Sequence, residues 1–159
     1  MPDYTILVID YEPRSIQKLS TLLRGAGYRV EVARDGLSGI EKFETVRPDL
    51  TLIEAMLPKK HGFEVCESIK KTPHGGSTPV VILTSVYKGR RYRWQARYQY
   101  GCDEYLERPV SDDSLLETVR RFLARSARAE AEESPDSPEP RPADTRPVHG
   151  KPPEVIPDP

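Results

Sequence analysis

Five short segments with the composition of β-strands recur along this chain, and their alternation with helical patterns constrains the fold more than any other feature. They span residues 5–9, 29–33, 50–54, 80–83 and 104–107. Between them, apolar residues recur at the three- and four-residue spacing of amphipathic helices. Continuous apolar strands such as Thr5–Ile9 are typical of parallel sheets that are covered on both faces. The alternation therefore predicts an α/β domain with a doubly wound five-stranded parallel sheet in the order 2-1-3-4-5.

Local signals predict where the helices begin and end. Pro13 suits the first turn of a helix, and the glycines at positions 25 and 27 stop that helix. Asp35 and Ser111 are expected to cap the second and the last helix through their side-chain oxygens. The third helix follows the turn that starts at Pro58, and a fourth is predicted over residues 90–100.

The last part of the chain differs in composition from the rest. Nine of the 16 prolines fall in residues 126–159, where eight acidic residues outnumber four basic ones. Such a sequence buries too little apolar surface to offset the entropy lost on ordering. We therefore expect a globular domain over residues 1–125 and a proline-rich, acidic, disordered tail over residues 126–159. The spacing of Pro135 and Pro138 is weak evidence for a proline-dependent recognition motif.

Bulk properties argue against several classes of protein. A formal net charge of −1 over 159 residues does not favour nucleic acid as a partner. No apolar run approaches the ~20 residues of a membrane helix, so we expect a cytoplasmic protein that does not contact membranes. Cys66 and Cys102 have neither metal-binding nor redox spacing and are expected to be buried free thiols.

Acidic side chains follow two of the predicted strands. Asp10 and Glu12 come directly after the first strand, and Glu54 ends the third. Because the chemistry of a doubly wound sheet gathers at the carboxyl ends of its strands, we expect an acidic pocket at that edge. The acids after the first strand argue against a nucleotide- or flavin-binding module, whose phosphate loop must accept anions at this place.

Several separated motifs resemble the receiver domains of two-component response regulators, over residues 4–124. Ile6–Pro13 looks like the first strand with its acid cluster, and Met56–Pro58 with Gly62–Val65 looks like the loop after the acceptor strand. Val81–Ser85 is similar to the fourth strand with its switch hydroxyl, and Gly101–Pro109 to the fifth strand with its terminal basic residue. The resemblance implies a flavodoxin- or CheY-like fold, a role in two-component phosphorelay signalling, no enzymatic activity, and a cis peptide bond before Pro109.

The resemblance also implies roles for single residues. In the family, two acids after the first strand and an acceptor aspartate hold Mg²⁺, while a lysine after the fifth strand contacts the phosphoryl group. Asp10 matches the first acid, and Thr84 and Tyr105 match the switch hydroxyl and the switch aromatic. Three residues depart from the pattern: Tyr11 replaces the second acid, Glu54 the acceptor aspartate and Arg108 the lysine.

These departures weaken the magnesium site that Asp10 and Glu54 would form. Mg²⁺ requires near-octahedral oxygen ligands, and Tyr11 removes one carboxylate. The extra methylene of Glu54 displaces its carboxylate by roughly a bond length, and about 1 Å of misplacement can cost on the order of a hundredfold in rate. We therefore expect no metal cofactor. The alternative is a phosphotransfer domain that accepts phosphate on Glu54, with Asp10 and Glu12 holding Mg²⁺.

A second hypothesis concerns Glu54 and Arg108 as a pair. A guanidinium can bind a carboxylate bidentately, which the ammonium of lysine cannot do. We hypothesise that the Glu54–Arg108 ion pair fixes one conformation without phosphate and holds Thr84 and Tyr105 in one set of rotamers. In the alternative, Glu54 is a tolerated, solvated carboxylate in a decayed pocket.

The segment from Tyr87 to Tyr100 holds five basic and five aromatic residues and no acid. Tyr, Trp and Arg are enriched at binding hot spots, so we expect a face for a protein partner here. Its candidate residues are Arg90, Arg91, Tyr92, Arg93, Trp94, Arg97 and Tyr98. One alternative is nucleic acid, with arginines on phosphates and rings stacked on bases. The other is a solvated helix whose arginines pair with Glu104 and Glu107.

These expectations combine into one reading of the chain. The resemblance and its departures predict an atypical receiver, or pseudo-receiver, that acts as a phosphorylation-independent interaction module through its fourth helix, fifth strand and fifth helix. The expected partners are a histidine kinase, a downstream output protein or a second copy of the chain.

Overall fold

The computed structural model describes residues 3–132, with side chains as far as residue 130. One sheet of five parallel strands has the order β2-β1-β3-β4-β5, as the sequence predicts. The strands are β1 (Thr5–Ile9), β2 (Arg29–Ala33), β3 (Leu50–Glu54), β4 (Val80–Thr84) and β5 (Glu104–Glu107). The proline-rich part of the expected tail, with its proline motif, lies outside the described residues.

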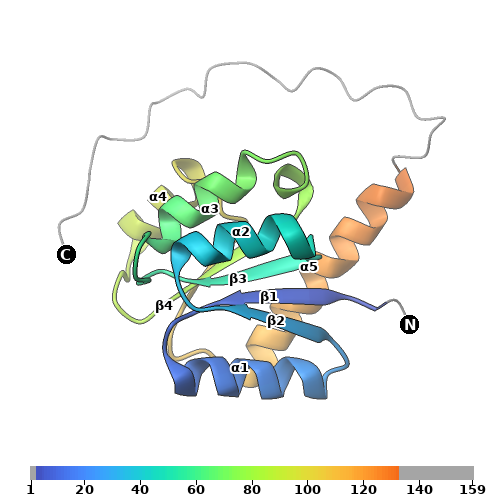
Figure 1. Cartoon of the computed structure of the whole chain (residues 1–159), viewed down its shortest axis with the longest axis horizontal. Helices are drawn as coiled ribbons and strands as arrows, with labels where there is room; N and C mark the ends of the chain where they lie inside the picture. The colour runs from blue at the N-terminus through green and yellow to red at the C-terminus, as the bar shows by residue number, and fades with distance from the viewer. Residues whose placement is uncertain (1–2, 133–159) are drawn as a thin grey trace.

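Helices cover both faces of this sheet (Figure 1). One face carries α1 and α5, and the other carries α2, α3 and α4. Their bounds are α1 (Pro13–Gly25), α2 (Gly36–Val46), α3 (Gly62–Lys70), α4 (Arg90–Tyr98) and α5 (Asp112–Glu132), and a short 3₁₀ turn, η1, spans Gly75–Ser77. The sheet is therefore buried on both sides, which explains why its strands lack an alternating polar pattern.

The core is divided in two by the alternation of side chains along each strand. Leu7 and Ile9 of β1 pack into the layer beneath α2 and α3, whereas Ile6 and Val8 pack beneath α1 and α5. All four are essentially inaccessible to solvent. The alternation follows from the two-residue period of a strand, which sends successive side chains to opposite faces of the sheet.

The predicted caps form as hydrogen bonds. Asp35 accepts a bond from Ser38 N at 2.8 Å, and Ser111 Oγ accepts one from Ser114 N at 3.1 Å. Gly62 begins α3 where the chain passes close to the end of β3. A Cβ there would lie 2.4 Å from the carbonyl oxygen of Glu54, so no larger residue fits without movement of the backbone.

Two helix ends differ from the sequence prediction. The fourth helix ends at Tyr98 rather than at residue 100, because the chain turns through Gly101 with a positive φ of 83°. The last helix continues through residues 126–132, which the composition had assigned to the tail. The loss of apolar periodicity at Ser126 marks where α5 leaves the core, since Ala, Arg and Glu still favour a helix in solvent.

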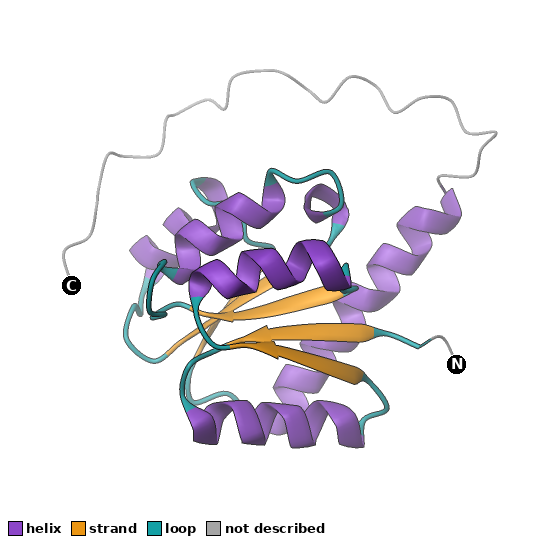
Figure 2. Cartoon of the chain, viewed as in Figure 1, coloured by secondary structure: helices purple, strands orange, loops and turns teal. Residues whose placement is uncertain are grey.

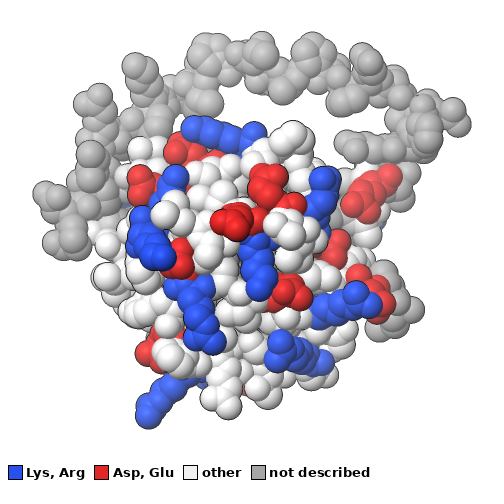
Figure 3. Space-filling model, viewed as in Figure 1, with Lys and Arg blue, Asp and Glu red and all other residues white. Residues whose placement is uncertain are grey.

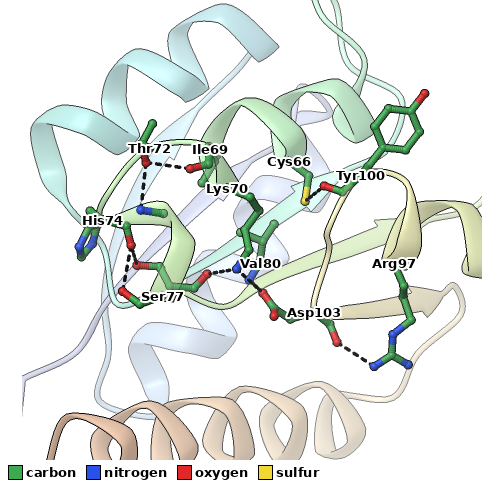
Figure 4. Close-up of polar contacts among 12 residues, drawn as sticks. Cys66, Ile69, Lys70, Thr72, His74, Ser77, Val80, Arg97, Tyr100 and Asp103 are labelled. Carbon is green, nitrogen blue, oxygen red and sulfur yellow. Dashed lines mark hydrogen bonds and ion pairs between the residues drawn. The ribbon is translucent and has the colours of Figure 1, made fainter. Parts of the chain in front are cut away.

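A polar contact ties α3 to the beginnings of β4 and β5 (Figure 4). Asp103 Oδ2 accepts hydrogen bonds from Lys70 Nζ at 2.9 Å and from Val80 N at 2.8 Å. The same ammonium donates to Thr78 O. Cys66 and Cys102 are buried free thiols, as predicted, and burial raises the pKa of the Cys102 thiol to about 12. Within residues 3–132, no helix is long and apolar enough to cross a membrane.

Candidate functional site

The carboxyl ends of all five strands lie at one edge of the sheet, where the arrowheads in Figure 2 point. Asp10 follows β1 directly and Glu54 is the last residue of β3; these two strands are neighbours in the sheet. Arg108 follows β5 and reaches across β4 towards them. Asp10 is only 1% exposed, so its charge lies in the protein interior.

Arg108 lies between the two carboxylates. Its Nη2 atom is 3.5 Å from Asp10 Oδ2 and 3.6 Å from Glu54 Oε1. Its Nη1 atom donates to Ser15 Oγ at 3.0 Å, and Ser15 Oγ donates in turn to Asp10 Oδ2. The predicted contact between Glu54 and Arg108 is present. It is not bidentate, because a single nitrogen approaches both acids while the other one is held by Ser15.

Glu54 is buried more deeply than a solvated carboxylate at a strand end. Its side chain is 11% exposed, and Oε2 accepts a hydrogen bond from Met56 N at 3.2 Å. Burial raises the pKa of the Glu54 carboxyl above its usual value, and the neighbouring charge of Asp10 adds to that effect. The Met56 bond and the positive charge of Arg108 oppose the rise in pKa without cancelling it.

Glu12 and Tyr11 do not enter this pocket. Glu12 Oε1 accepts a hydrogen bond from Arg14 N at 2.9 Å, so its carboxylate caps α1. Asp10 Oδ1 accepts a bond from the backbone N–H of Glu12 instead. Tyr11 is 48% exposed and lines a shallow cavity of about 270 Å³ with Met56 and His61. Within residues 3–130, no three acidic, histidine or cysteine side chains converge on one metal-sized site.

Thr84 and Tyr105 both hold the backbone of Tyr87, one through its N–H and the other through its carbonyl oxygen. Thr84 Oγ1 accepts hydrogen bonds from Val86 N at 3.1 Å and Tyr87 N at 3.0 Å. The hydroxyl of Tyr105 points inward and donates to Tyr87 O at 2.5 Å. Burial raises the pKa of the Tyr105 hydroxyl, which therefore remains a neutral donor. The two residues that match the family's switch thus fix the loop that leads into α4.

The candidate partner residues divide between two faces of α4. Tyr92 packs inward against Tyr87, with ring centroids 5.1 Å apart, and Arg93 pairs with Glu107 of β5 at 3.1 Å. The remaining residues line the outer side of α4, and we refer to them as the α4 platform: Arg90, Arg91, Trp94, Arg97 and Tyr98. Glu104, the other expected partner of the arginines, pairs with Arg121 of α5 instead.

One contributor to the site, Ser15, was missed in the sequence. Ser15 joins Arg108 to Asp10, and its place in the first turn of α1 was a readable signal, since that turn begins beside Asp10. Pro109 follows a cis peptide bond, as the family resemblance implied.

On the face that Figure 3 shows, basic and acidic side chains are interspersed and neither sign forms a continuous field.

Comparison with known proteins agrees with this geometry. The family model for the response regulator receiver domain matches residues 6–120. The DNA-binding dual master transcriptional regulator RpaA of Synechocystis is 34% identical over 123 residues, which cover 77% of this chain and 50% of that protein. Response regulator MprA of Mycobacterium tuberculosis is 32% identical over 129 residues, which cover 81% of this chain and 54% of that one.

Solved structures of response regulators and receiver domains have a similar fold. The chemotaxis response regulator CheY4 of Vibrio cholerae superposes with a TM-score of 0.70 at 26% identity, over 76% of this chain and 99% of that one. The receiver domain of a sensor histidine kinase from Pseudomonas aeruginosa, solved with magnesium in its active-site cleft, gives a TM-score of 0.70 at 26% identity. That match covers 77% of this chain and 99% of the other.

This chain belongs to the response regulator receiver domain family, the signalling modules of two-component systems. It spans about half the length of the curated relatives that it matches.

Proposed function

We propose that this receiver domain works without phosphorylation, as a protein-interaction module whose binding face is formed by α4, β5 and α5. The observation that carries this proposal is the guanidinium of Arg108, which lies 3.5 Å from Asp10 and 3.6 Å from Glu54. The positive charge that a receiver takes from a metal ion is supplied here by the protein's own side chain.

The surrounding residues support the same conclusion, because they do not fit a magnesium ion. Both oxygens of Asp10 already accept hydrogen bonds, and the carboxylate of Glu12 is engaged at the start of α1. A divalent cation would have to displace Arg108 from its place between the two acids. Phosphate on Glu54 would add negative charge beside Asp10 without the metal that offsets it in the family.

A constitutive conformation follows from the contacts around Tyr87. Its N–H donates to Thr84, and its carbonyl oxygen accepts from Tyr105. The α4 platform is then presented to a partner in one arrangement at all times. By analogy with the family, the partner is a histidine kinase or an output protein, and a second copy of the chain is the remaining candidate.

The test is a fluorescence titration of the full chain, with Trp94 as its single tryptophan reporter. We expect no change in emission when millimolar Mg²⁺ and then beryllofluoride, an analogue of the phosphoryl group, are added. A saturable change that requires both additions would overturn the proposal and favour phosphotransfer to Glu54. Circular dichroism recorded in parallel verifies that the fold is intact.

A second test addresses the internal ion pair. Arg108→Ala should shift the NMR signals of Thr84, Tyr87 and Tyr105, because the charge that holds Asp10 and Glu54 together is removed. Arg120→Ala is the matched control, since Arg120 is exposed on α5. If both variants leave the Thr84–Tyr105 region unchanged, the ion pair does not fix that conformation.

A further inference from the structure

The α4 platform is a charged and aromatic surface that the described part of the chain leaves open. Trp94 and Tyr98 form a ring pair with centroids 5.3 Å apart, and Tyr98 is 62% exposed. Arg90 and Arg91 are exposed and make no ion pair with any residue between 3 and 130. Aromatic rings flanked by arginines are the composition of a binding hot spot, and proline-rich segments commonly bind to such aromatic surfaces.

The same chain carries a segment of complementary composition directly after α5. Residues 133–140 read Glu-Ser-Pro-Asp-Ser-Pro-Glu-Pro, and no basic residue occurs between positions 129 and 140. The acids recur every third residue, at 133, 136 and 139, and prolines precede the second and third of them. We refer to residues 133–140 as the acidic-proline segment.

The three-residue spacing of the acids equals the repeat of a polyproline II helix. A polyproline II helix has three residues per turn and a rise of about 3.1 Å per residue, so it would align the three acids on one edge at a spacing of about 9 Å. Arg90 and Arg97 are seven residues apart on α4, which at 1.5 Å per residue corresponds to about 10 Å along the helix axis. The two spacings match, and Trp94 lies between the two arginines.

We propose that the acidic-proline segment of this chain binds to its own α4 platform. In the bound form two successive acids of the segment pair with Arg97 and with Arg90 and its neighbour Arg91, and the prolines pack against the rings of Trp94 and Tyr98. This inference deepens the proposed function and rests on it, because it assigns an internal competitor to the face that binds a partner. A partner must then displace the segment, or must carry a similar acidic, proline-containing sequence.

The path from α5 to the platform is short enough. Both α4 and α5 run antiparallel to the strands, so both end at the edge of the sheet where β4 and β5 begin. At that edge Glu130 of α5 and Asp103 line one cavity, and Arg97 Nη2 donates to Asp103 O at 3.3 Å (Figure 4). The acidic-proline segment begins at the residue after α5, and its eight residues span up to about 25 Å when extended at 3.1 Å per residue, roughly twice the length of α4.

Each ion pair between the segment and the platform should contribute little to the free energy of binding. The contact nevertheless forms because the segment and the platform belong to one chain. Exposed ion pairs contribute little individually and are screened over a Debye length of about 8 Å at physiological ionic strength. Tethering nevertheless gives the segment an effective concentration in the millimolar range at the platform. The expected result is a closed form that salt or a competing acidic partner opens.

The experiment reverses charge in the full chain and follows Trp94 emission. One variant carries Glu133→Lys, Asp136→Lys and Glu139→Lys; its matched control carries Asp144→Lys, Glu154→Lys and Asp158→Lys, which make the same change in net charge farther along the chain. We expect the first variant to shift Trp94 emission to longer wavelength, as water reaches the ring, and the control to keep the wild-type spectrum. Identical spectra for the two variants would overturn the proposal.

Charge reversal on the platform provides the complementary arm. Arg90→Glu with Arg91→Glu should open the wild-type chain and should restore the closed spectrum when combined with the Lys-substituted segment. Failure of this rescue would contradict a direct contact. Emission that is independent of protein concentration supports binding within one chain, whereas a shift that appears only on concentration would overturn it in favour of a second copy.

The same samples separate this inference from the proposed function. Mg²⁺ and beryllofluoride are added to both charge-reversed variants. A response to these additions would contradict phosphorylation-independent action, whereas the difference between the two variants would still report on the segment. If the two variants have the same spectrum and neither responds to beryllofluoride, the segment contact is contradicted and the proposed function is not.

Discussion

Three ionisable side chains share the small volume at the end of β1 and β3, and their charges do not balance. Asp10 and Glu54 face one guanidinium, so when all are ionised the cluster of Asp10, Glu54 and Arg108 keeps one negative charge in a largely buried place. Arginine suits this position better than lysine, because its planar fork can contact Ser15 and the acids at once. Burial raises the pKa of the Glu54 carboxyl, and the unbalanced charge of Asp10 adds to that effect.

The first prediction concerns Glu54 and pH. Its pKa is higher in the folded state than its usual value of 4.5, so the folded state binds a proton more tightly than the unfolded state. The contribution to stability is therefore fully present below pH 4.5 and is lost as pH rises through the raised pKa. Glu54→Gln should gain stability relative to the wild type over that window.

Urea denaturation at a series of pH values measures this effect. The difference in unfolding free energy between Glu54→Gln and the wild type should grow with pH and then level off. Glu44→Gln, at an exposed position of α2, controls for the loss of one carboxylate. A difference that is flat or falls with pH would show that Arg108 outweighs burial at Glu54.

The second prediction concerns Arg108. Arg108→Ala leaves the buried carboxylate of Asp10 without its cation, and we expect a loss of about 2 kcal/mol in unfolding free energy at pH 8. The loss should be smaller at pH 5, because Glu54 can take up a proton there. Arg108→Lys keeps the charge and should cost less. Equal losses for Ala and Lys in urea denaturation would show that packing of the side chain, and not its charge, is what matters.

The convergence of Asp10, Glu54 and Arg108 was predictable, because the ends of adjacent parallel strands must meet at one edge. The prediction for Glu12 was wrong, since Glu12 does not join the acidic pocket but caps α1. It lies two residues from Asp10, yet it precedes Pro13, whose fixed φ begins a helix that needs a cap. The free N–H groups of the first helical turn bind that carboxylate more readily than a pocket already occupied by Arg108.

At the scale of elements, the loop between β4 and α4 is held by side chains rather than by secondary structure. Thr84 and Tyr105 both bind Tyr87, whose ring also packs against His61 at 5.2 Å and Tyr92 at 5.1 Å between centroids. The position of α4 therefore depends on two hydrogen bonds and an aromatic cluster. A substitution of Thr84 or Tyr105 should therefore perturb this loop before it perturbs the rest of the domain.

The third prediction tests this dependence. Tyr105→Phe removes one hydrogen bond and leaves the carbonyl oxygen of Tyr87 unsatisfied, which should cost about 1 kcal/mol in unfolding free energy. Hydrogen exchange should accelerate for residues 86–90 and remain unchanged in β1 and β3. Tyr4→Phe is the matched control on the opposite face of the sheet. Faster exchange throughout the sheet would instead indicate global destabilisation.

Strands were predictable from the sequence to within one residue, and helix ends less so. Each strand is a buried apolar run bounded by polar or turn residues, and this change in composition fixes where the strand begins and ends. Helix ends depend on where tertiary contact stops, which a periodic pattern does not record. Thus α5 continues on exposed Ala127 and Ala129 after its contacts with the core have ended.

At the scale of the whole molecule, the acid pocket and the α4 platform are linked through the end of β4. Glu54 ends β3, the neighbour of β4; Thr84 ends β4, and the Tyr87 loop leads into α4. Arg108 lies at one end of that path, between Asp10 and Glu54. Replacing the three residues that depart from the family pattern should therefore return a metal- and phosphate-dependent response that is read at Trp94.

The fourth prediction is that response. A variant with Tyr11→Asp, Glu54→Asp and Arg108→Lys regains a second carboxylate after β1, a shorter carboxylate at the end of β3, and a cation that cannot bridge both acids. We expect Mg²⁺ followed by beryllofluoride to produce a saturable change in Trp94 emission in this variant. No single substitution should suffice, because Mg²⁺ needs several oxygen ligands in near-ideal geometry and Arg108 must leave their centre.

The control adds Asp10→Asn to the triple variant and should abolish the response, since the deepest carboxylate is then lost. Circular dichroism must show the same helix content in all variants, so that a silent spectrum is not mistaken for an unfolded protein. A triple variant that stays folded and shows no change in Trp94 emission would mean that residues other than these three prevent the response. In that case the fixed Tyr87 loop, rather than the internal cation, would be what separates this chain from a phosphate-responsive receiver.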